Sequence, residues 1–401
     1  MNTSRPLLLD NPVQKYAWGS KSAIQNLVGL EPDGHTPWAE LWMGAHPKSP
    51  SRLEVNGQWM GLDQWISENP GAVLGKYAAE TFEATLPYLL KILAADQPLS
   101  IQAHPDRKHA QEGFKRENRL GIPVEAPHRN YRDPWPKPEL ICSIKPFGAM
   151  IGFRKPDEIK ELIKQFCPEM LGPEIRMLKD QPDENGLKNF FYSIMTMENT
   201  RRKKAIGEAM ARTENPCSLE ANWIRRLYKF YPEDIGVLSP AFLNLVTIEP
   251  NEAIFLAPGI IHAYLYGVAV EIMANSDNVL RGGLTQKHID PEELMRVVNF
   301  SHGAVQRITP QPAGPCEMRY CTDAREFALS RLKISRKDKW QAPGIHSAEI
   351  LFCIKGEAKI LINATDFCLS IKAGQSALVP AAAGKYEIIG EAVLYRAGVR
   401  L

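Results

Sequence analysis

The spacing of hydrophobic and polar positions changes several times along this chain and divides it into four regions. From residue 11 to about residue 143, short apolar runs are separated by Pro and Gly. This pattern predicts strands at 87–93 and 99–104, with helical interruptions near 61–68 and 107–118. The first region is therefore expected to be mainly β.

From residue 156 to about residue 231 the apolar residues recur at helical spacing. One run that follows the i, i+3, i+4, i+7 rule is Ile159, Leu162, Ile163 and Phe166. A second one-sided run occupies residues 223–230. Asp157 and Glu158 near the start of the first run and Lys164 near its end suit the helix dipole. This region predicts a helical insertion.

Strand spacing returns from residue 239 onward. The apolar runs 242–248 and 253–256 surround a polar turn and predict a hairpin. Between residues 306 and 401 we expect short strands at 348–354, 358–362, 367–371 and 376–379, with turns at Lys355-Gly356 and Ala373-Gly374. Regular spacing of this kind is typical of a jelly roll or barrel. Residues 252–262 and 374–385 both place a short apolar strand before a Pro-containing turn, which indicates two related β-barrels.

Composition narrows the class of protein. A chain of 401 residues is too long for one compact core, so two or three domains are expected. A formal net charge of +2 argues against a nucleic-acid or membrane-surface binder. The Leu run at 7–9 is too short for a signal peptide or a membrane span. The seven cysteines form no CxxC pair and indicate reduced thiols, so the expected location is cytoplasmic.

The clearest candidate chemistry is in residues 99–105, LSIQAHP. Side chains of a strand alternate between its faces, so Gln102 and His104 emerge on the same face. Pro105 then ends the strand at a rim, where ligand sites of barrels occur. The competing interpretation is a polar pair that faces solvent.

Two further segments supply possible metal ligands. Glu139 follows Lys137-Pro138, and because proline cannot donate to a sheet ladder, a strand that starts at Glu139 is natural. His262 follows the Pro-Gly turn of residues 257–262, which resembles the second sequence box of the cupin superfamily. Two imidazoles, a carboxylate and an amide oxygen form a four-ligand set for a divalent metal that leaves room for water or substrate. An exposed carboxylate and a hydrogen-bonded core histidine are the alternatives.

A second set of polar residues suits an anionic ligand. Arg281 precedes Gly282-Gly283, and a guanidinium beside two glycines suits close approach to an anionic group. The alternative is a solvated arginine in a turn. Lys91 and Ser100 lie before Gln102 and His104 in the sequence, close to the strand that carries these two residues. An ammonium and a hydroxyl can both bind a phosphate.

Longer motifs extend these patterns over nearly the whole chain. They are YAWGS at 16–20, AELWMGAHP at 39–47, PLSIQAHP at 98–105, YRDP at 131–134, HAY at 262–264, MANSDN at 273–278 and RGGLT at 281–285. In this order they resemble the type I phosphomannose isomerases, which are zinc-dependent cupin enzymes. The resemblance implies a mainly β fold with a helical insertion, made of two cupin-type β jelly-roll barrels and an α-helical domain. The expected division is a catalytic domain of 1–154 with 237–305, a helical domain of 155–236 and a C-terminal β domain of 306–401.

The same resemblance implies an aldose–ketose isomerase that interconverts mannose 6-phosphate and fructose 6-phosphate through an enediol. The implied ligands of one Zn²⁺ per chain are Gln102, His104, Glu139 and His262. Arg281 and Lys137 are the implied catalytic residues. Lys91, Ser100 and Asp277 are expected at the substrate, and Asp277 and a metal-bound hydroxide are alternatives for the proton-transfer base. The expected partner is a small sugar phosphate, with no nucleic acid and no membrane, and the chain is expected to be a cytoplasmic monomer.

One box departs from the family. The family reads Asn-His-Lys-Pro-Glu where this chain has Trp135-Pro136-Lys137-Pro138-Glu139. The missing histidine, at Pro136, is a candidate for proton handling in the family. Either another group does that work here, or activity is lower, or the substrate differs. A sugar-phosphate-binding cupin with altered substrate or reduced activity is therefore one alternative function. An Fe(II) cupin oxygenase, with two His and one carboxylate at the metal, is the other.

Overall fold

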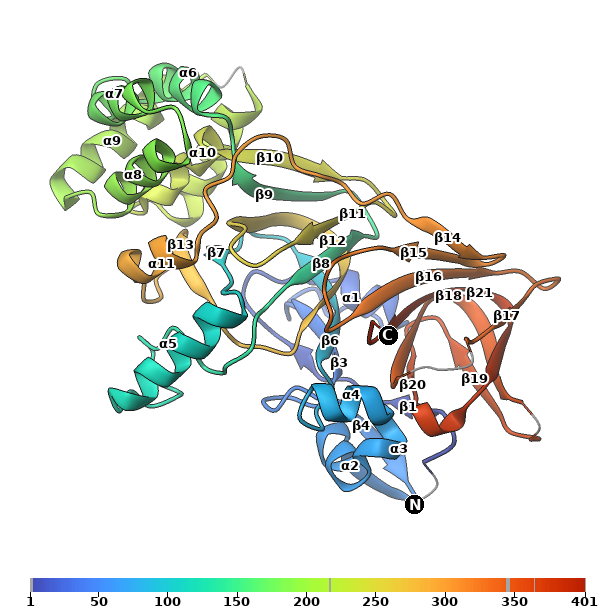
Figure 1. The fold of residues 1–401 in the computed structure, drawn as a ribbon. Coiled ribbons are helices and arrows are strands. Elements are labelled where there is room, and N and C mark those ends of the chain that lie inside the picture. Colours follow the sequence, from blue (N-terminus) through green and yellow to red (C-terminus); the bar gives the residue numbers. More distant parts are fainter. Residues whose placement is uncertain (1–2, 216–217, 344–346, 364, 401) are drawn as a thin grey trace.

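The fold is taken from a computed structural model, which describes residues 3–215, 218–343, 347–363 and 365–400. A central β region lies between a cluster of helices at one end and a strongly curved C-terminal sheet at the other (Figure 1). The helices of residues 156–230 project from the central β region, as the insertion pattern predicts. A mainly β fold with a helical insertion is confirmed.

The central β region is built around one long strand, β12 (His262–Ala274). It pairs antiparallel with β6 (Tyr88–Ala95), β7 (Ile101–Ala103), β8 (Glu139–Ser143) and β9 (Phe147–Phe153). The other strands of this sheet are β2 (Val13–Gln14), β3 (Glu40–Gly44), β10 (Leu243–Ile248), β11 (Ala253–Leu256) and β13 (Leu280–Gly283). Because these strands meet around β12, segments distant in sequence face one common interior.

Further helices and a two-stranded hairpin lie outside this sheet. They are α1 (Ala23–Leu27), β4 (Arg52–Val55), β5 (Gln58–Gly61), α2 (Leu62–Glu68), α3 (Pro70–Leu74), α4 (Lys76–Thr81), α5 (Arg107–Arg119) and α11 (Pro291–Val297). The helical interruptions expected near 61–68 and 107–118 are confirmed as α2 and α5. Asp106 caps α5, since its carboxylate accepts the His109 N–H at 2.8 Å.

The helical insertion buries the apolar stripe that its sequence predicts. Its elements are α6 (Pro156–Phe166), α7 (Gly172–Asp180), α8 (Glu184–Met195), α9 (Asn199–Arg212), α10 (Leu219–Phe230) and the 3₁₀ helix η1 (Ile235–Ala241). Ile159, Ile163 and Phe166 are buried against the neighbouring helices. Asp183 and Glu198 cap α8 and α9 through their carboxylates.

The predicted hairpin of residues 242–256 is wrong in its pairing, although both strands exist. β10 pairs with β9, with Ile248 opposite Phe147, whereas β11 pairs with β8, with Leu256 opposite Glu139. The turn between them includes Asn251 at φ 73° and carries the chain from one partner to the other. Two strands that are consecutive in sequence therefore pair with different partners in the central β region.

The C-terminal β region is a second antiparallel sheet. Its strands are β14 (Gln311–Gly314), β15 (Glu317–Tyr320), β16 (Ala328–Ile334), β17 (Lys339–Gln341), β18 (Glu349–Ile362), β19 (Cys368–Lys372), β20 (Ser376–Val379) and β21 (Tyr386–Gly398), with the short helix η2 (Ala381–Ala383) before β21. The strand β1 (Leu7–Leu9) joins this sheet from the other end of the chain and pairs with β20, with Leu7 opposite Leu378.

The predicted turn at Lys355-Gly356 is wrong, because β18 runs through both residues. The pairing register with β21 shifts between Cys353 and Lys355, which marks a β-bulge. Gly356 has a φ of 80°, and a Cβ there would lie 2.0 Å from the Glu391 carbonyl oxygen. The glycine thus permits close approach of two strands. The predicted turn at Ala373-Gly374 is confirmed, and Gly374 has a φ of 85°.

The two β regions pack on each other through a shared apolar core. Tyr88 of β6 is buried there, and its hydroxyl lies 3.0 Å from the Ala348 carbonyl oxygen and 3.2 Å from that of Ala397. In the described part of the chain, none of the helices has the length and hydropathy to cross a bilayer. The six cysteines that the structure describes are free, and Cys217 lies outside the described residues.

Candidate functional site

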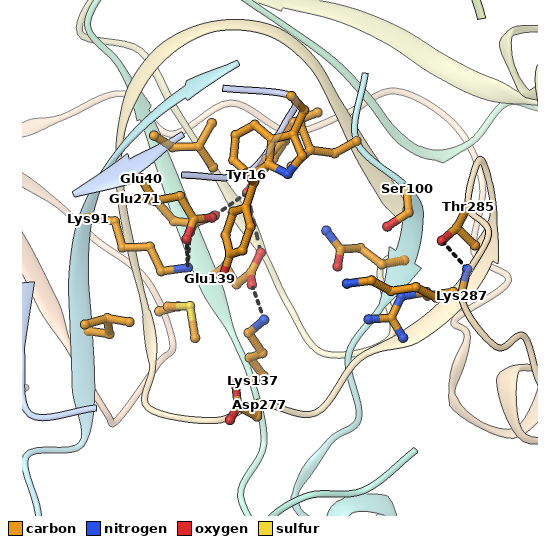
Figure 2. Close-up of a pocket in the computed structure, with 18 of the residues that line it drawn as sticks. Tyr16, Glu40, Lys91, Ser100, Lys137, Glu139, Glu271, Asp277, Thr285 and Lys287 are labelled. Carbon is orange, nitrogen blue, oxygen red and sulfur yellow. Dashed lines mark hydrogen bonds and ion pairs between the residues drawn. The ribbon is translucent and has the colours of Figure 1, made fainter. Parts of the chain in front are cut away.

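A cavity of about 690 Å³ opens at one end of the central β region. Its wall includes residues of β3, β6, β7, β8, β12 and β13, together with Tyr231, which follows α10 of the helical insertion. Lys91, Glu40 and Glu271 lie on one side of the cavity, and Ser100, Thr285 and Lys287 lie on the other (Figure 2). The polar residues selected from the sequence therefore gather around one space.

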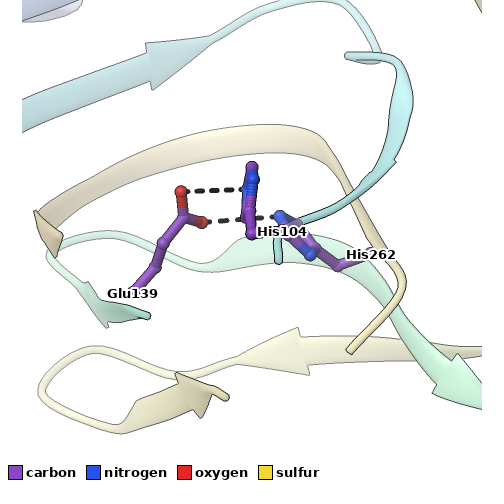
Figure 3. Close-up of side chains that lie close together, drawn as sticks. All are labelled: His104, Glu139 and His262. Atoms are coloured by element: carbon purple, nitrogen blue, oxygen red, sulfur yellow. Dashed lines mark ion pairs between the residues drawn. The ribbon is translucent and has the colours of Figure 1, made fainter. Parts of the chain in front are cut away.

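Three of the four expected metal ligands converge beside this cavity. The Nε2 atom of His104 lies 3.2 Å from Glu139 Oε1, and the Nε2 atom of His262 lies 3.4 Å from Glu139 Oε2. The ring centroids of the two histidines are 5.2 Å apart, and all three side chains are buried (Figure 3). The ligand atoms lie within 4.8 Å of one another, a spacing that suits one bound metal ion.

Backbone carbonyls set the tautomers of both imidazoles. His104 Nδ1 lies 2.8 Å from the Asn278 carbonyl oxygen, and His262 Nδ1 lies 2.9 Å from that of Ile260. A carbonyl accepts only, so each Nδ1 carries the proton and each Nε2 presents a lone pair. Both Nε2 atoms are buried without a hydrogen-bond donor among the described residues. Two lone pairs and a carboxylate that face each other fit a divalent cation between them.

The electrostatics of His104 and Glu139 favour the forms that bind metal. Burial and the nearby Lys137 ammonium lower the pKa of His104 to about 4, so its imidazole is neutral at neutral pH. Burial opposes ionisation of Glu139, but its interactions with His104 and Lys137 outweigh burial and hold its pKa well below the usual value. Lys137 Nζ lies 3.2 Å from Glu139 Oε1. The site thus offers the neutral imidazole of His104 and the Glu139 carboxylate, beside the buried Nε2 atom of His262.

Gln102 lies next to this trio in the sheet. It is the antiparallel partner of His262 on one side and of Arg281 on the other. Its side chain lines the cavity. The alternation expected from residues 99–105 is thereby consistent with Gln102 as a fourth ligand.

A buried cluster of charges forms the wall around Lys91. Its ammonium lies 3.0 Å from Glu271 Oε2 and 3.8 Å from Glu40 Oε2. Burial disfavours the Lys91 cation, yet the charges of Glu271 and Glu40 outweigh burial and raise its pKa. Tyr264 donates to Glu271 at 3.0 Å and lies 3.4 Å from Glu139, so it connects this cluster to the metal ligands. The charge of Lys91 is therefore already balanced by carboxylates.

Asp277 lies at the rim and is held by two basic side chains. Its carboxylate is 2.7 Å from Lys48 Nζ and 3.4 Å from His46 Nε2. Burial opposes ionisation, but the hydrogen bonds to His46 and Lys48 outweigh it and lower the pKa of Asp277 well below its usual value. Among the described histidines, His46 is the one whose side chain lines the cavity.

Arg281 and Lys287 bring positive charge that no acid balances. Both line the cavity, and no ion pair of either is found in the part of the chain that the structure describes. Burial and the charge of Arg132 lower the pKa of Arg281, and burial and the charges of Arg281, Arg132 and Lys48 lower that of Lys287. Mutual repulsion of this kind is relieved by a bound anion, so this side of the cavity suits a phosphate.

The residues that depart from the family pattern lie outside the cavity wall. Neither Trp135 nor Pro136 lines the cavity, whereas Lys137 and Glu139 do. Arg107 lies over the Trp135 ring at 5.2 Å, and the Trp135 carbonyl accepts from the Asn278 side-chain amide at 2.9 Å. The substitution is accommodated by packing behind the site.

Among the cavity residues that sequence reasoning missed are His46, Glu271 and Lys287. His46 lies within the motif at 39–47, but no spacing connects it to Asp277, 231 residues later in the chain. Glu271 sits in an apolar strand, where an isolated carboxylate is a usable signal of a buried partner. Lys287 lies six residues after Arg281 in a polar loop and has no distinguishing local pattern.

Three family models match this chain. They are the catalytic domain of type I phosphomannose isomerase over residues 7–156, its helical insertion domain over 162–243 and the cupin domain of mannose-6-phosphate isomerase over 317–398. Mannose-6-phosphate isomerase of Escherichia coli (strain K12) is 40% identical over 390 residues, which cover 97% of this chain and 98% of that protein. Mannose-6-phosphate isomerase 1 of Arabidopsis thaliana is 31% identical over 96% of this chain and 92% of its own.

Solved structures agree with the sequence relatives. The crystal structure of a point mutant of phosphomannose isomerase from Salmonella typhimurium has a TM-score of 0.92 and 38% identity, and the match covers 99% of this chain and 100% of that chain. A zinc-bound crystal structure of mannose 6-phosphate isomerase has a TM-score of 0.91 at the same identity and coverage.

Proposed function

Since this chain belongs to the type I phosphomannose isomerase family, we propose that its cavity interconverts mannose 6-phosphate and fructose 6-phosphate through an enediol intermediate. The observation that carries this proposal is the convergence of two imidazole lone pairs and a carboxylate beside a cavity with unbalanced cations. An aldose–ketose isomerase needs a polarised carbonyl, a group that moves a proton between C1 and C2, and an anchor for the phosphate.

Zinc is the metal that this site holds, one ion per chain, with His104, Glu139 and His262 as ligands and Gln102 as the fourth. When bound, zinc acts as a Lewis acid that polarises the sugar carbonyl. The protein contributes the ligand geometry. Tyr264 and Lys137 both contact Glu139, so they hold its carboxylate toward the two imidazoles.

The phosphate is held by Arg281, Lys287 and Ser100. The two cations have no acidic partner among the described residues, and a phosphate dianion compensates both charges. Ser100 lines the same side of the cavity and supplies a hydroxyl donor. The reacting end of the sugar then points toward the metal ligands.

The opposite side of the cavity positions the sugar. Lys91 is neutralised by Glu271 and Glu40, so we assign its ammonium to a sugar oxygen instead of the phosphate. Lys137, buried between the metal ligands and the cavity, moves a proton at the substrate carbonyl. A carboxylate whose pKa lies as low as that of Asp277 is a weak base, so Asp277 orients a sugar hydroxyl.

A direct activity assay tests this function. Purified zinc-loaded protein is incubated with fructose 6-phosphate, and the product sugar is identified by chromatography. Arg281→Ala is expected to reduce kcat/KM about a hundredfold with unchanged zinc content, because the removed guanidinium binds the substrate phosphate. Lys287→Ala is expected to raise KM about tenfold. Formation of no mannose 6-phosphate, or equal loss of zinc and activity in Arg281→Ala, would contradict the assignment.

The two other functions predict different results. An Fe(II) oxygenase consumes oxygen and gains activity with iron, and the named relatives, all mannose-6-phosphate isomerases, do not favour it. A sugar-phosphate-binding cupin without activity is suggested only by Trp135-Pro136, which lie outside the cavity wall. It binds fructose 6-phosphate without converting it, so the same assay separates it from the isomerase.

We further propose that one chain is the functional unit. Three of the proposed metal ligands, His104, Glu139 and His262, converge within one chain, so the proposed unit needs no ligand from a second copy. The division into residues 1–154 with 237–305, 155–236 and 306–401 places every proposed ligand in the first of these units. Light scattering at assay concentration tests the monomer, since a dimer mass would contradict it.

The free cysteines support a reducing, cytoplasmic location.

A further inference from the structure

The segment that joins α10 to η1, residues 231–234, contacts two loops on the phosphate side of the cavity. The Tyr231 hydroxyl donates to the Pro98 carbonyl at 3.0 Å, two residues before Ser100. The Asp234 carboxylate accepts the Thr285 N–H at 3.1 Å through Oδ2. Ser100 directly precedes β7 and Thr285 follows β13, and these two strands pair, with Gly283 opposite Ile101. One short segment of the helical insertion therefore contacts both of the loops that carry Ser100 and Thr285.

Asp234 uses its two oxygens for two different parts of the chain. Oδ1 accepts the Gly236 N–H at 2.7 Å and caps η1, while Oδ2 holds Thr285. The cap alone is a structural role and needs only one oxygen. The second bond crosses from the helical insertion to the loop that follows β13. This bond is the one that bears on the site.

The loop after β13 has an unusual conformation that needs support. Leu284 is buried and has a φ of 53°, which a branched side chain rarely adopts. Gly283 has a φ of 130°, and a Cβ there would lie 3.1 Å from Asp234 Oδ1. The Thr285 hydroxyl then accepts the Lys287 N–H at 3.1 Å. The path from Asp234 through Thr285 to Lys287 is thus continuous and closely packed.

We propose that Asp234 is a positioning residue for the phosphate anchor and that, with Tyr231, it fixes the spacing between Ser100 and Lys287. This inference rests on the proposed function, in which those residues bind the substrate phosphate. The helical insertion then contributes to substrate affinity although it supplies none of the metal ligands. Without the Asp234 bond, the loop relaxes from its strained conformation and Lys287 leaves its position.

Two substitutions of Asp234 test the cap of η1 and the bond to Thr285. Asparagine is isosteric but has one accepting oxygen, so it keeps one N–H and presents its own NH₂ to the other. Asp234→Ser retains a capping hydroxyl for η1 but is too short to reach Thr285. Asp183→Ala, at the exposed cap of α8, is the matched control because it removes a cap from the same insertion far from the cavity.

The measurements are KM and kcat for fructose 6-phosphate, the inhibition constant of inorganic phosphate, the zinc content and the thermal midpoint of the zinc-loaded full chain. Both Asp234 variants are expected to raise KM and the phosphate inhibition constant about tenfold, with zinc unchanged and kcat altered much less. Asp183→Ala is expected to lower only the thermal midpoint. In the Lys287→Ala background, Asp234→Asn is expected to add little, because the two residues act in series.

The outcomes distinguish this inference from the proposed function. If Lys287→Ala weakens phosphate inhibition but neither Asp234 variant does, Asp234 is only a helix cap and the inference is wrong. If Lys287→Ala itself leaves phosphate inhibition unchanged, the assigned phosphate anchor is wrong. Equal changes in Asp183→Ala and the Asp234 variants would show a general stability effect and would also overturn the inference.

Discussion

The histidines of the metal site are oriented by the backbone before any metal arrives. The Asn278 and Ile260 carbonyls fix both Nδ1 protons, so each Nε2 lone pair points at Glu139. In the absence of a cation, this arrangement places lone pairs against a carboxylate in a buried space, which is unfavourable. The orientation of these side chains therefore favours a bound cation.

Replacement of His262 by Ala tests whether this histidine is a metal ligand. Loss of one of two imidazole ligands is expected to abolish zinc retention after dialysis and to remove turnover. Zinc is measured by atomic absorption and turnover with fructose 6-phosphate. His35→Ala, at an exposed histidine, serves as the control and should retain both. A His262→Ala protein with full zinc and normal activity would show that the ligand assignment is wrong.

Some of the site was accessible from the sequence and some was not. Alternation places Gln102 and His104 on one face, and Pro138 marks the start of the strand at Glu139, because both are properties of a local strand. The pairing of Lys91 with Glu271 joins residues 180 positions apart, and only the register of β6 and β12 brings them together. Lys287 depends on a loop with a strained leucine, for which no local pattern exists.

At the scale of elements, two helical glycines are expected to respond in opposite ways to the same substitution. Alanine is favoured over glycine in a helix by about 1 kcal/mol. At Gly207 in α9 a Cβ would enter open space, so Gly207→Ala is expected to stabilise the protein by about 0.5–1 kcal/mol. In α5, a Cβ on Gly113 would lie 2.3 Å from the Tyr131 ring. Gly113→Ala is therefore expected to destabilise by about 1–3 kcal/mol.

Urea titration of the two variants gives the free energies of unfolding for this comparison. Tyr131 has little freedom to move aside, because its hydroxyl donates to Glu293 at 2.7 Å and its N–H donates to Glu117 at 2.8 Å. If Gly113→Ala stabilises the protein as much as Gly207→Ala, the ring is not held as described.

The caps of the helical insertion predict a pH dependence. The pKa of Asp183 lies below its usual value, mainly because its carboxylate accepts the Gly186 N–H. The pKa of Glu198 is lowered in the same way, mainly by the Thr200 N–H. A carboxyl with a lowered pKa in the folded state stabilises that state above its unfolded pKa of about 4. This contribution is lost as the pH falls from about 4 through the folded pKa.

The double variant Asp183→Asn, Glu198→Gln keeps capping oxygens that do not titrate. At pH 6 the wild-type protein is expected to have the higher thermal midpoint by circular dichroism at 222 nm, and the difference should close below about pH 4. The metal ligands are the same in both proteins and cancel in the comparison. A difference that stays constant from pH 6 to pH 3 would contradict the assigned caps.

Element types followed from residue periodicity more closely than element pairing did. The stripe of α6 and the apolar runs of β10 and β11 are local, and each formed the element that its spacing predicts. The partners of β10 and β11 are set by β9 and β8, about a hundred residues earlier, which local spacing does not encode. The sequence predicts a turn at Lys355-Gly356, but a glycine at positive φ suits a turn and a β-bulge equally well. The sequence alone therefore does not distinguish the two.

For the whole molecule, Tyr88 connects the two β regions, and its hydroxyl is a test of their coupling. Tyr88→Phe leaves the buried Ala348 and Ala397 carbonyls without this donor and is expected to lower the free energy of unfolding by about 1–3 kcal/mol. The zinc content and kcat should stay within twofold of the wild-type values, since Tyr88 does not belong to the cavity wall. Calorimetry measures the loss, with Tyr77→Phe on the exposed face of α4 as the control. Equal midpoints for both variants would contradict a role of Tyr88 in the interface.

The pairing of β1 with β20 has a consequence for the order in which the protein is made. Leu7 is synthesised 371 residues before its partner Leu378. Throughout translation the nascent chain therefore carries an apolar strand whose hydrogen-bonding edge is open, and its closure is a late, long-range event. A chain that stops before residue 376 lacks β20, and the edge of β1 that pairs with it then stays exposed.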